Sequence, residues 1–543
     1  MLFSEIYKTI SQKEKKIILV VILFLIVFSS FPFWYGHFTQ SEDKVFLYFN
    51  SLVRGDRYVY YSYIKQAIDG NFLFSNLFTT EAQPHKMLNV LWLIPGLLGR
   101  IFHLKPHFAY EIFREFLIIP SVLLIYLMLA YFFSDFKKKI ISFALICFGS
   151  GIGVLTYNFW NVFYSDKTYW NAATDLYVPE SNFFLSLYVS PHFLASIMLL
   201  YLSLFLLFIA FEKNSVKKSI WGGLCALILF SFHPFHILTV FFIPFAFIIV
   251  KSLQNKKIDR QKIKLFFIFA AISSPSIIYY LYLLSNDHLL LQKSLQNYCP
   301  SPNIIFLALG FGGLLFFGIW GIYQSYKNKK LFLNDLYLYF FVWIIVQFVL
   351  LYFPINFQRR LIEGWQLPLV FFSALSLTKL YESKKYIFTK FKIALLFLIF
   401  LLFFFSNFFN VIRDSYYYTQ KLDVFYFKKD IYQAIIKIGD YDKNKAVLAD
   451  FIISNRIPGI IGFPVYLGHG VETAYYDIKV ANFIWFFEQK TSDEKRVEFL
   501  QNNNIGYLIY TPDMNKTGFA PETKDFFEKI YDSADAKVYK TVF

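Results

Sequence analysis

The chain has 543 residues, of which 57% are hydrophobic and only 17% charged. Soluble domains are usually about 45–50% apolar, and the mean hydropathy of this chain is +0.46. The net charge of +16 is unevenly placed, because residues 413–543 hold 17 basic and 18 acidic residues and leave +17 to residues 1–412. The composition predicts a helical membrane module followed by a small water-soluble domain. It argues against nucleic acid as a partner, because the soluble part has no basic excess.

Three cysteines, Cys147, Cys225 and Cys299, are scattered along the chain. Their spacing indicates neither a disulfide framework nor a cysteine-based metal site. The first apolar run, Ile17 to Tyr35, is long, and no small-residue cleavage site follows it. We therefore expect it to be the first membrane anchor rather than a cleaved signal.

Eleven apolar segments are candidates for membrane-spanning helices, which need about 20 apolar residues. A further apolar stretch, 87–102, is ambiguous. The eleven segments are 17–35, 112–133, 140–160, 183–211, 219–232, 237–250, 265–285, 302–323, 336–353, 367–381 and 393–412.

Lysine placement decides the expected topology, because cytoplasmic loops are enriched in Lys and Arg. If 87–102 crosses the membrane, every later basic cluster falls on the side opposite to the first one. If it re-enters or lies in the interface, all six clusters fall inside. We therefore expect eleven crossings of the cell (inner or plasma) membrane, a cytoplasmic N-terminus and an extracytoplasmic C-terminal domain. The clusters are Lys13/Lys15/Lys16, Lys137–Lys139, Lys213/Lys217/Lys218, Lys251 to Lys264, Lys327/Lys329/Lys330 and Lys384 to Lys392.

This topology divides the chain into a membrane module, 1–412, and an extracytoplasmic domain, 413–543. The module's outer loops, 36–111, 161–182 and 286–301, are where acids, histidines and tyrosines gather. Polar groups on one face of a helical bundle indicate that chemistry happens there. The C-terminal domain is predicted to be α/β. Its expected helices are 424–438 and 480–502, and its expected strands are 445–449, 465–468, 507–510 and 537–542.

Asp56 lies beyond the first span, in an amphipathic run that reads GDRYVYY. A carboxylate near the outer bilayer surface can accept a proton from an acceptor hydroxyl. The alternative is a helix cap, since Asp56 precedes a helical pattern.

The second outer loop holds Asp175 and Glu180, and His192 follows inside the next apolar run. A histidine in a membrane helix is costly unless it faces a polar cavity. Glu180 and His192 are therefore candidates for one shared site. A glutamate at a helix start and a packed core histidine are the alternative.

His233 and His236 flank a Pro-Phe pair at a tight turn between two apolar segments. Imidazole binds several divalent ions, and Glu180 is a candidate third ligand for such a metal. Two histidines do not make a site by themselves, and the sequence has no HExxH pattern. A purely structural turn is the alternative.

Arg359 and Arg360 lie at the outer end of the 336–353 segment, and Arg114 lies near the outer end of its own span. Arginine pairs hold phosphate in a fixed fork geometry. An outer arginine pair runs against the usual bias of basic residues toward the cytoplasm. Anchoring to the headgroups of membrane lipids is the alternative.

In this order, these residues resemble the GT-C superfamily of membrane glycosyltransferases, which includes protein O-mannosyltransferases and lipid-linked aminoarabinose transferases. The shared pattern is a first span and then an outer-loop acid before a Tyr-rich helix, here Asp56 in GDRYVYYSYIKQA. A Pro-containing re-entrant helix follows, matching Gln83-Pro84-His85 through Gly99. An arginine starts the second span, matching Arg114, and a second acid in the next outer loop matches Asp175 or Glu180.

A closer resemblance is to bacterial GT-C-like proteins with PE…PH, HPF, RR and IP…G…VYLGH…T elements. These elements stand here at 179–192, 233–235, 359–360 and 457–473. The resemblance covers most of the chain, although each motif is short. The GDR at the first-loop site lacks the paired acids of the O-mannosyltransferases, which leaves metal use and the identity of the base open.

The resemblance implies a GT-C-like fold with about eleven spans and a defined reaction. The donor would be a polyprenyl-phosphate sugar, carrying a hexose or pentose, and the acceptor a glycan, lipid or protein outside the membrane. Asp56 would deprotonate the acceptor hydroxyl for inverting attack. Arg114, Arg359 or Arg360 would stabilise charge on the lipid phosphate, with or without a divalent metal as the one candidate cofactor.

Other functions suit a chain of this kind. A transporter or flippase for lipid-linked saccharides would carry charges at the bilayer midplane and often internal repeats. A polysaccharide polymerase or ligase would also use outer-loop Arg and His, but it usually lacks a C-terminal α/β domain. A non-catalytic membrane scaffold is the third alternative. Polar residues on one face and no visible repeat favour the glycosyltransferase.

Overall fold

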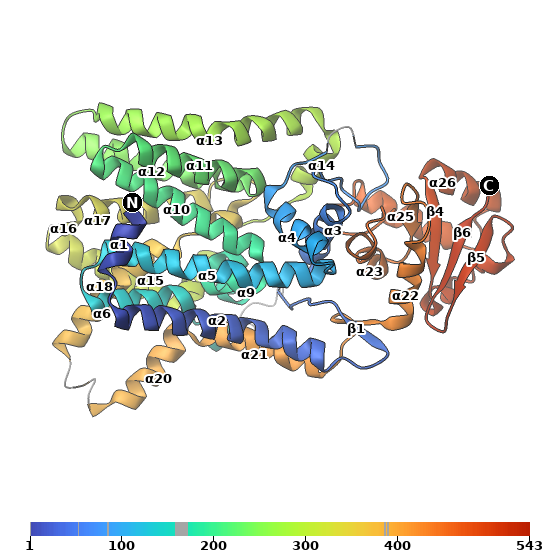
Figure 1. The fold of residues 1–543 in the computed structure, drawn as a ribbon, viewed down its shortest axis with the longest axis horizontal. Coiled ribbons are helices and arrows are strands. Elements are labelled where there is room, and N and C mark those ends of the chain that lie inside the picture. The colour runs from blue at the N-terminus through green and yellow to red at the C-terminus, as the bar shows by residue number, and fades with distance from the viewer. Residues whose placement is uncertain (1, 53, 84–85, 158–171, 385–386, 388–389) are drawn as a thin grey trace. The chain divides into compact units, whose positions relative to one another are not determined.

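The computed structural model describes residues 2–52, 54–83, 86–157, 172–384, 387 and 390–543. It is mostly helical, with one small sheet region near the C-terminus (Figure 1). The chain divides into two compact units. The first unit consists of Met1–Pro32, Arg114–Tyr280 and Tyr298–Asp414, and the second of Phe33–Phe113, Leu281–Asn297 and Ser415–Phe543. The predicted outer loop 36–111 thus belongs to the same compact unit as most of the C-terminal segment.

Seven helical segments are long and apolar enough to cross a membrane. A helix pair bent by 71°, α20 (Lys392–Phe403) and α21 (Phe405–Thr419), would make an eighth. The chain is therefore a multi-pass helical membrane protein, as predicted, while the count of eleven spans stays a prediction. The seven segments are α2 (Gln12–Phe38), α5 (Pro106–Phe132), α10 (Pro191–Lys213), Pro234–Gln254, α13 (Arg260–Asn286), α15 (Ile304–Lys327) and Gln358–Ser383.

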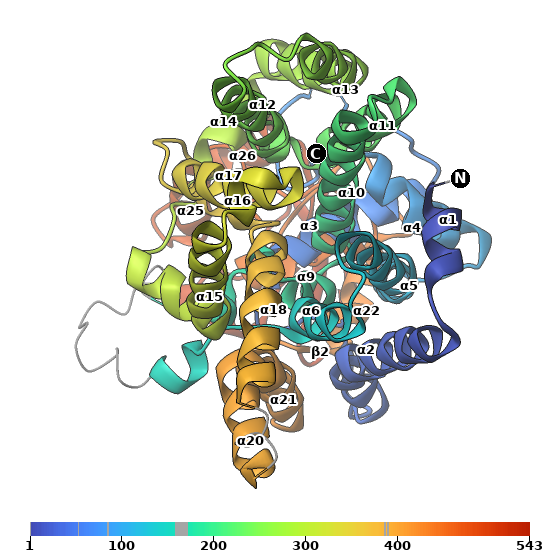
Figure 2. The ribbon, with the colours of Figure 1, turned by 90° about the vertical axis from the view of Figure 1, so that its left-hand side faces the viewer.

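The other helical elements of the first unit are shorter, and they include the parts that make up the segments Pro234–Gln254 and Gln358–Ser383. Figure 2 views many of this unit's helices nearly end-on. They are α1 (Leu2–Thr9), α6 (Phe136–Phe148), α8 (Thr174–Tyr177), η1 (Pro179–Ser181), α9 (Phe183–Val189), α11 (Val216–Phe232), η2 (Pro234–His236), α12 (Ile237–Gln254), α16 (Lys330–Leu333), α17 (Asp335–Leu351), η3 (Gln358–Ile362) and α18 (Gln366–Ser383).

Two expected spans are interrupted. The predicted helix 183–211 breaks into α9 and α10 at Ser190, whose hydroxyl accepts a hydrogen bond from the His192 amide, and Pro191 then opens α10. The first turn of a helix tolerates proline because its amide would have no intrahelical partner. The predicted span 393–412 bends at Phe404. The part of segment 140–160 after residue 157 lies outside the described residues, as do residues 161–171 of the second outer loop.

Helices α10 and α18 form the interior of the first unit, because 89% of the apolar window in each of their segments is buried. A helix that is apolar all round belongs in such a core. Helix α15 approaches α18 closely at Gly321, where an added Cβ would lie 2.1 Å from the carbonyl oxygen of Phe372. Small residues at helix interfaces allow such approaches in membranes.

The second unit begins with a pair of packed helices, α3 (Arg54–Ile68) and α4 (Val90–Ile101). Gly96 and Gly99 of α4 lie directly against Ala67 and Ile68 of α3, where a Cβ would clash. Helix α4 has 12 residues, a length of about 18 Å, which is short of the roughly 30 Å hydrocarbon core. This length agrees with the expectation that 87–102 does not cross, which stays a prediction. Pro84 and His85 lie outside the described residues.

A two-stranded sheet joins the first outer loop to the C-terminal segment. β1 (Lys44–Phe46) pairs antiparallel with β2 (Tyr426–Lys428). A separate four-stranded sheet has the order β3-β4-β6-β5, with β3 parallel to β4 and the other pairs antiparallel. Its strands are β3 (Ala446–Leu448), β4 (Ile505–Tyr510), β5 (Phe527–Asp532) and β6 (Lys537–Thr541).

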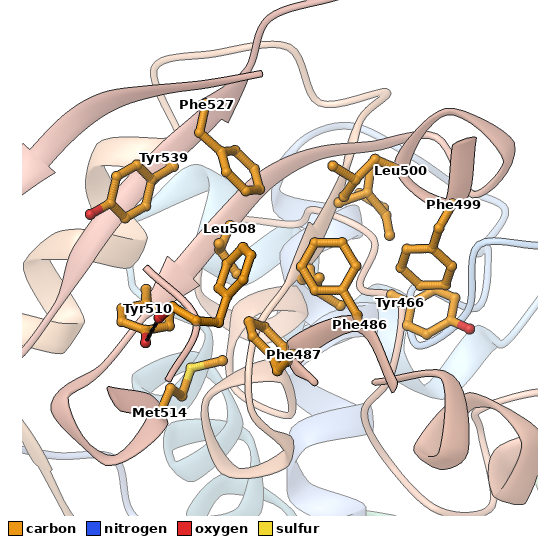
Figure 3. Packing of buried hydrophobic residues seen from close by; sticks show 14 of the residues in the cluster. Tyr466, Phe486, Phe487, Phe499, Leu500, Leu508, Tyr510, Met514, Phe527 and Tyr539 are labelled. Atoms are coloured by element: carbon orange, nitrogen blue, oxygen red, sulfur yellow. Dashed lines mark hydrogen bonds between the residues drawn. The ribbon is translucent and has the colours of Figure 1, made fainter. Parts of the chain in front are cut away.

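Aromatic side chains fill the core under this four-stranded sheet. Phe486 and Phe487 of α25 pack with Phe499 of α26 and Leu508 of β4 (Figure 3). The other helices of the unit are short. They are α14 (His288–Gln296), α22 (Lys429–Ile438), α23 (Phe451–Ser454), α24 (Ile457–Ile460), α25 (Tyr476–Phe487), α26 (Asp493–Asn502), η4 (Pro512–Thr517) and η5 (Pro521–Thr523).

The C-terminal sheet confirms the α/β prediction with four differences. The predicted helix 424–438 begins only at Lys429, because residues 426–428 form β2. The predicted strand 465–468 makes only a single bridge, from Val465 to Val447. The predicted helix 480–502 is two helices, α25 and α26. β5 was not predicted, because it is an edge strand with several exposed positions and no alternating apolar pattern.

A buried ion pair holds α3 in place inside the second unit. Arg57 Nη1 lies 2.8 Å from Glu111 Oε1 and also donates a hydrogen bond to the Tyr48 carbonyl. The guanidinium lies over the rings of Phe33 and Tyr110, 4.9 and 5.0 Å from their centroids. An acceptor pair and two aromatic rings thus surround much of this buried cation.

Candidate functional site

The predicted site residues fall into two groups, one in each unit. Asp56 belongs to the second unit, in the first turn of α3. Its carboxylate Oδ1 lies 3.6 Å from Nε2 of His469, and 41% of the Asp56 side chain is exposed. The proposed base is thus accessible on one side and faces an imidazole on the other.

The turn that carries His469 fixes the state of its ring. The amides of Val471 and Glu472 both point at Nδ1, at 3.3 and 3.4 Å. An imidazole nitrogen that accepts from amides carries no proton, so the neutral ring has its proton on Nε2, facing Asp56. Thr473 closes the turn by accepting from the Gly468 amide and donating to the Phe78 carbonyl.

The second group, in the first unit, is built on the His233–His236 turn. Residues three apart in a 3₁₀ turn project in the same direction, and η2 brings the two rings to a centroid distance of 4.6 Å. Between them lies Glu363, whose Oε2 is 2.6 Å from His236 Nε2 and 3.4 Å from His233 Nδ1. The Ser196 hydroxyl lies 2.6 Å from His233 Nδ1 and 3.0 Å from Glu363 Oε2.

The turn before α18 holds Glu363 rigidly. Gln347 of α17 donates to the carbonyls of Leu361 and Glu363, at 2.7 and 2.6 Å. Gly364 follows with φ +92°, and a Cβ there would lie 2.7 Å from Leu200. Only glycine suits that position, because it adopts positive φ freely and leaves room for the leucine.

The arginine pair lies on the same turn. Arg360 is 3.9 Å from Glu180 and lies over the ring of Phe235, 4.7 Å from its centroid. Arg359 lies over Tyr177 at 5.7 Å, and its amide donates to the Cys299 carbonyl. The structure therefore brings Glu180, Arg359, Arg360 and the His-Pro-Phe-His turn into one neighbourhood.

Among the described residues, the group that could hold a metal is His233, His236 and Glu363. Glu180, which the sequence suggested as the third ligand, is not in that group and faces Arg360 instead. The rings of His192 and His233 lie 4.7 Å apart, centroid to centroid. His192 thus borders the group.

Arg114 is fully buried in the first unit. Its guanidinium donates to the hydroxyls of Ser29 and Ser30, at 3.0 and 2.7 Å, and to the Leu187 carbonyl at 3.3 Å. These contacts join α2, α5 and α9. They give Arg114 a structural role. Its contact with substrate stays a prediction.

Asp175 is buried against a glycine-rich segment. The Gly153 amide donates to its Oδ2 at 3.1 Å, and a Cβ on Gly153 would lie 2.2 Å from Oδ1. Burial raises the pKa of Asp175 to about 7, although hydrogen bonds from Ser406 and Gly153 act in the opposite direction. A carboxyl with a pKa in this range exchanges its proton near neutral pH.

Sequence reasoning missed two of the residues that complete these groups. Glu363 stands in the run Leu361-Ile362-Glu363-Gly364-Trp365, and an acid at the entry of an apolar span is a signal that could have found it. His469 was noticed only as part of the VYLGH element. Its distance from Asp56 along the sequence hid the pairing, since the two lie more than 400 residues apart.

Comparison with solved structures identifies the fold. The Archaeoglobus fulgidus oligosaccharyltransferase AglB, solved in the apo form and in complex with an inhibitory peptide and a dolichol-phosphate, superposes in each case with a TM-score of 0.56 at 13% identity, over 98% of this chain and 75% of that one. The mycobacterial arabinofuranosyltransferase AftD superposes with a TM-score of 0.52 at 10% identity, over 97% of this chain and 41% of that one. The chain has the GT-C fold.

ArnT from Cupriavidus metallidurans, bound to undecaprenyl phosphate, matches with a TM-score of 0.47 at 11% identity, over 96% of this chain and 98% of that one. No protein-family model and no curated protein matches the sequence. The superpositions with AglB and AftD confirm, at the level of the fold, the resemblance predicted from the motifs.

Asp175→Asn should change how stability depends on pH. An aspartate in an unfolded chain has a pKa of about 3.9, so between about pH 4 and pH 7 the folded protein keeps a proton that the unfolded chain has lost. The contribution of Asp175 to stability is therefore fully present below about pH 4 and declines as the pH rises to about 7. Asparagine does not titrate, so the Asp175→Asn variant lacks this decline in stability with pH.

Thermal denaturation of the purified protein in detergent at several pH values checks this. The melting temperature of Asp175→Asn, relative to the wild type, should rise from about pH 4 and level off above about pH 7. Asp525→Asn, at an exposed position, is the matched control and should show no such trend. A difference that stays constant with pH would contradict the assignment.

Proposed function

We propose that the protein is a membrane glycosyltransferase that transfers a hexose or pentose from a polyprenyl-phosphate donor to an extracytoplasmic acceptor, with inversion and with Asp56 as the base. The GT-C fold supports this proposal, since the proteins that share it are an oligosaccharyltransferase and an arabinofuranosyltransferase. The observation that carries it is the half-exposed carboxylate of Asp56 facing the protonated nitrogen of His469.

The geometry suits a general base. One oxygen of Asp56 lies 3.6 Å from Nε2 of His469. The exposed part of the side chain leaves lone pairs for the hydroxyl of an acceptor. The acceptor oxygen attacks the anomeric carbon, its proton passes to Asp56, and the bond to the lipid phosphate breaks. A phosphate leaves without a strong acid, so one base is sufficient.

The donor is a lipid that the bilayer delivers, and the acceptor is a glycan, a lipid or a protein. AglB was solved with a dolichol-phosphate and with an acceptor peptide, and these ligands support a lipid-linked donor and a separate acceptor here. Arg114, Arg359 and Arg360 are the proposed phosphate-binding residues, and Asp175, Glu180, His192 and His233 are the proposed remaining substrate contacts. A divalent metal is the one cofactor that we consider.

Asp56→Asn keeps the size of the side chain and removes its charge. Turnover of a labelled polyprenyl-phosphate sugar by the purified protein in detergent should fall by about 10²–10⁴, with donor binding nearly unchanged. Asp69→Asn, in an ion pair with Lys65 beyond the end of the same helix, is the matched control and should retain full activity. In detergent there is no membrane across which a lipid could be flipped. Formation of a glycosidic bond under these conditions therefore distinguishes a transferase from a flippase.

If Asp56→Asn transfers sugar at the normal rate, Asp56 has only a structural role in the first turn of its helix. The base would then be sought among Asp175 and Glu180.

Arg359→Gln with Arg360→Gln should weaken donor binding strongly. Charge-assisted contacts to a buried phosphate are each worth about 1.5–3 kcal/mol, and glutamine keeps most of the length of the side chain. Binding of a labelled polyprenyl phosphate measures the loss. Arg260→Gln, at an exposed helix start, is the matched control. Unchanged affinity in a folded double variant would exclude the arginine pair from the phosphate site.

The proposed reaction places the second unit outside the cytoplasm and the N-terminus inside. Six basic clusters support this orientation, because all of them fall on the cytoplasmic side when 87–102 does not cross. Reporter fusions after residue 420 should give an extracytoplasmic signal. A cytoplasmic signal would reverse the orientation and remove Asp56 from the side where acceptors are expected.

A further inference from the structure

The group formed by His233, His236 and Glu363 has the composition of a metal site. One ligand atom from each residue lies within 4.8 Å of those from the others. All three side chains are at most 1% exposed. Two histidines and one glutamate are a familiar ligand set for zinc, which takes imidazole nitrogen and carboxylate oxygen at about 2.0–2.2 Å.

The distances suit a four-coordinate ion. Ligand atoms about 2.0–2.1 Å from a tetrahedral centre are roughly 3.3 Å from one another. The distance from His233 Nδ1 to Glu363 Oε2 is already 3.4 Å, while that from His236 Nε2 to Glu363 Oε2 is 2.6 Å. The second distance would have to open by about 0.7 Å to reach that spacing.

Glu363 also needs a positive charge. Among the described residues it has no Lys or Arg partner, and its neighbours are the two imidazoles and Ser196. The nearby cation Arg360 faces Glu180. An ionised carboxylate buried without a counter-charge is very costly, so a bound cation or a protonated histidine must balance Glu363 unless the carboxyl is itself protonated. Its Oε1 also has no hydrogen-bond partner among the described residues.

The surrounding structure holds the ligands firmly, as metal sites require. Gln347 fixes the backbone of Glu363 and is itself held by the Trp343 indole, whose nitrogen donates to its side-chain oxygen at 2.6 Å. Pro234 opens the 3₁₀ turn that projects both histidines to one side. A turn used only to connect two helices would not require a buried acid opposite it.

We propose that His233, His236 and Glu363 bind one zinc-class divalent cation. The site lies wholly within the first unit and does not include Asp56. The cation joins the turn between α11 and α12 to the turn before α18, and it neutralises Glu363. The ligands are fully buried, so the ion should remain bound through purification and exchange slowly.

Metal analysis of the purified full-length protein tests this directly. Wild-type protein should carry about one zinc ion per chain after a gel-filtration step in metal-free buffer. His236→Gln and Glu363→Gln should each lower this to less than about a tenth, since losing one of three protein ligands removes most of the affinity. His288→Gln, an exposed histidine at the start of α14, is the matched control and should keep the full zinc content.

A second measurement needs no substitution. Wild-type protein is stripped with a membrane-permeable chelator and titrated with cobalt(II). Tetrahedral coordination should produce strong visible absorption that saturates at one ion per chain, and added zinc should abolish it and raise the melting temperature. This result keeps the proposal testable if the variants fail to fold.

Two results would overturn the proposal. One is a folded wild-type protein that holds no metal and shows neither cobalt absorption nor a shift in melting temperature with zinc. The group would then be a hydrogen-bonded network in which a protonated histidine balances Glu363. The other is equal zinc content in wild type and Glu363→Gln, which would place the ion elsewhere. Neither result bears on the proposed role of Asp56, which lies in the other unit.

Discussion

The placement of the proposed base depends on the buried ion pair between Arg57 and Glu111. Asp56 immediately precedes Arg57, so whatever fixes the arginine also fixes the first turn of α3. Both side chains are almost completely buried. Two charges in such surroundings have lost their hydration, and separating them would leave an uncompensated charge at a cost of about 3–5 kcal/mol. The pair therefore holds α3 against the start of α5 and keeps Asp56 at the edge of the unit.

Buried amide side chains hold irregular backbone in place in the first unit. Irregular backbone at membrane depth is tolerated only where protein groups satisfy its hydrogen bonds. Gln366 of α18 donates to the Leu145 carbonyl and accepts from the Phe183 amide, and Asn407 donates to the Gly149 carbonyl. These contacts replace the helical hydrogen bonds lost where α6 ends and α9 begins.

The sequence predicted the fold class better than it predicted the boundaries of the elements. Apolar length is a property of single segments, and it was enough to predict a multi-pass helical protein. The interruption at Ser190 was missed because the apolar run continues on both sides of it. The compact unit that contains both Asp56 and His469 was missed because the strand pairing of β1 with β2 joins residues far apart in sequence. In the site, the His233–His236 turn could be predicted from its spacing, whereas its partner Glu363 was missed because it lies far along the chain, at the entry of another span.

Histidine side chains occur in two different settings in this protein, and the surroundings of each decide what it can do. His469 is held by two backbone amides at Nδ1, which leaves a proton on the nitrogen that faces a partly exposed carboxylate. Asp56 thus faces an imidazole on one side and is open to solvent on the other. His233 and His236 instead enclose a carboxylate that water does not reach. An ionised Glu363 there is balanced either by a protonated imidazole or by a cation shared with the two rings, because it has no Lys or Arg partner among the described residues. A carboxylate partly open to water can turn over protons, while one sealed between histidines is suited to holding a charge in place.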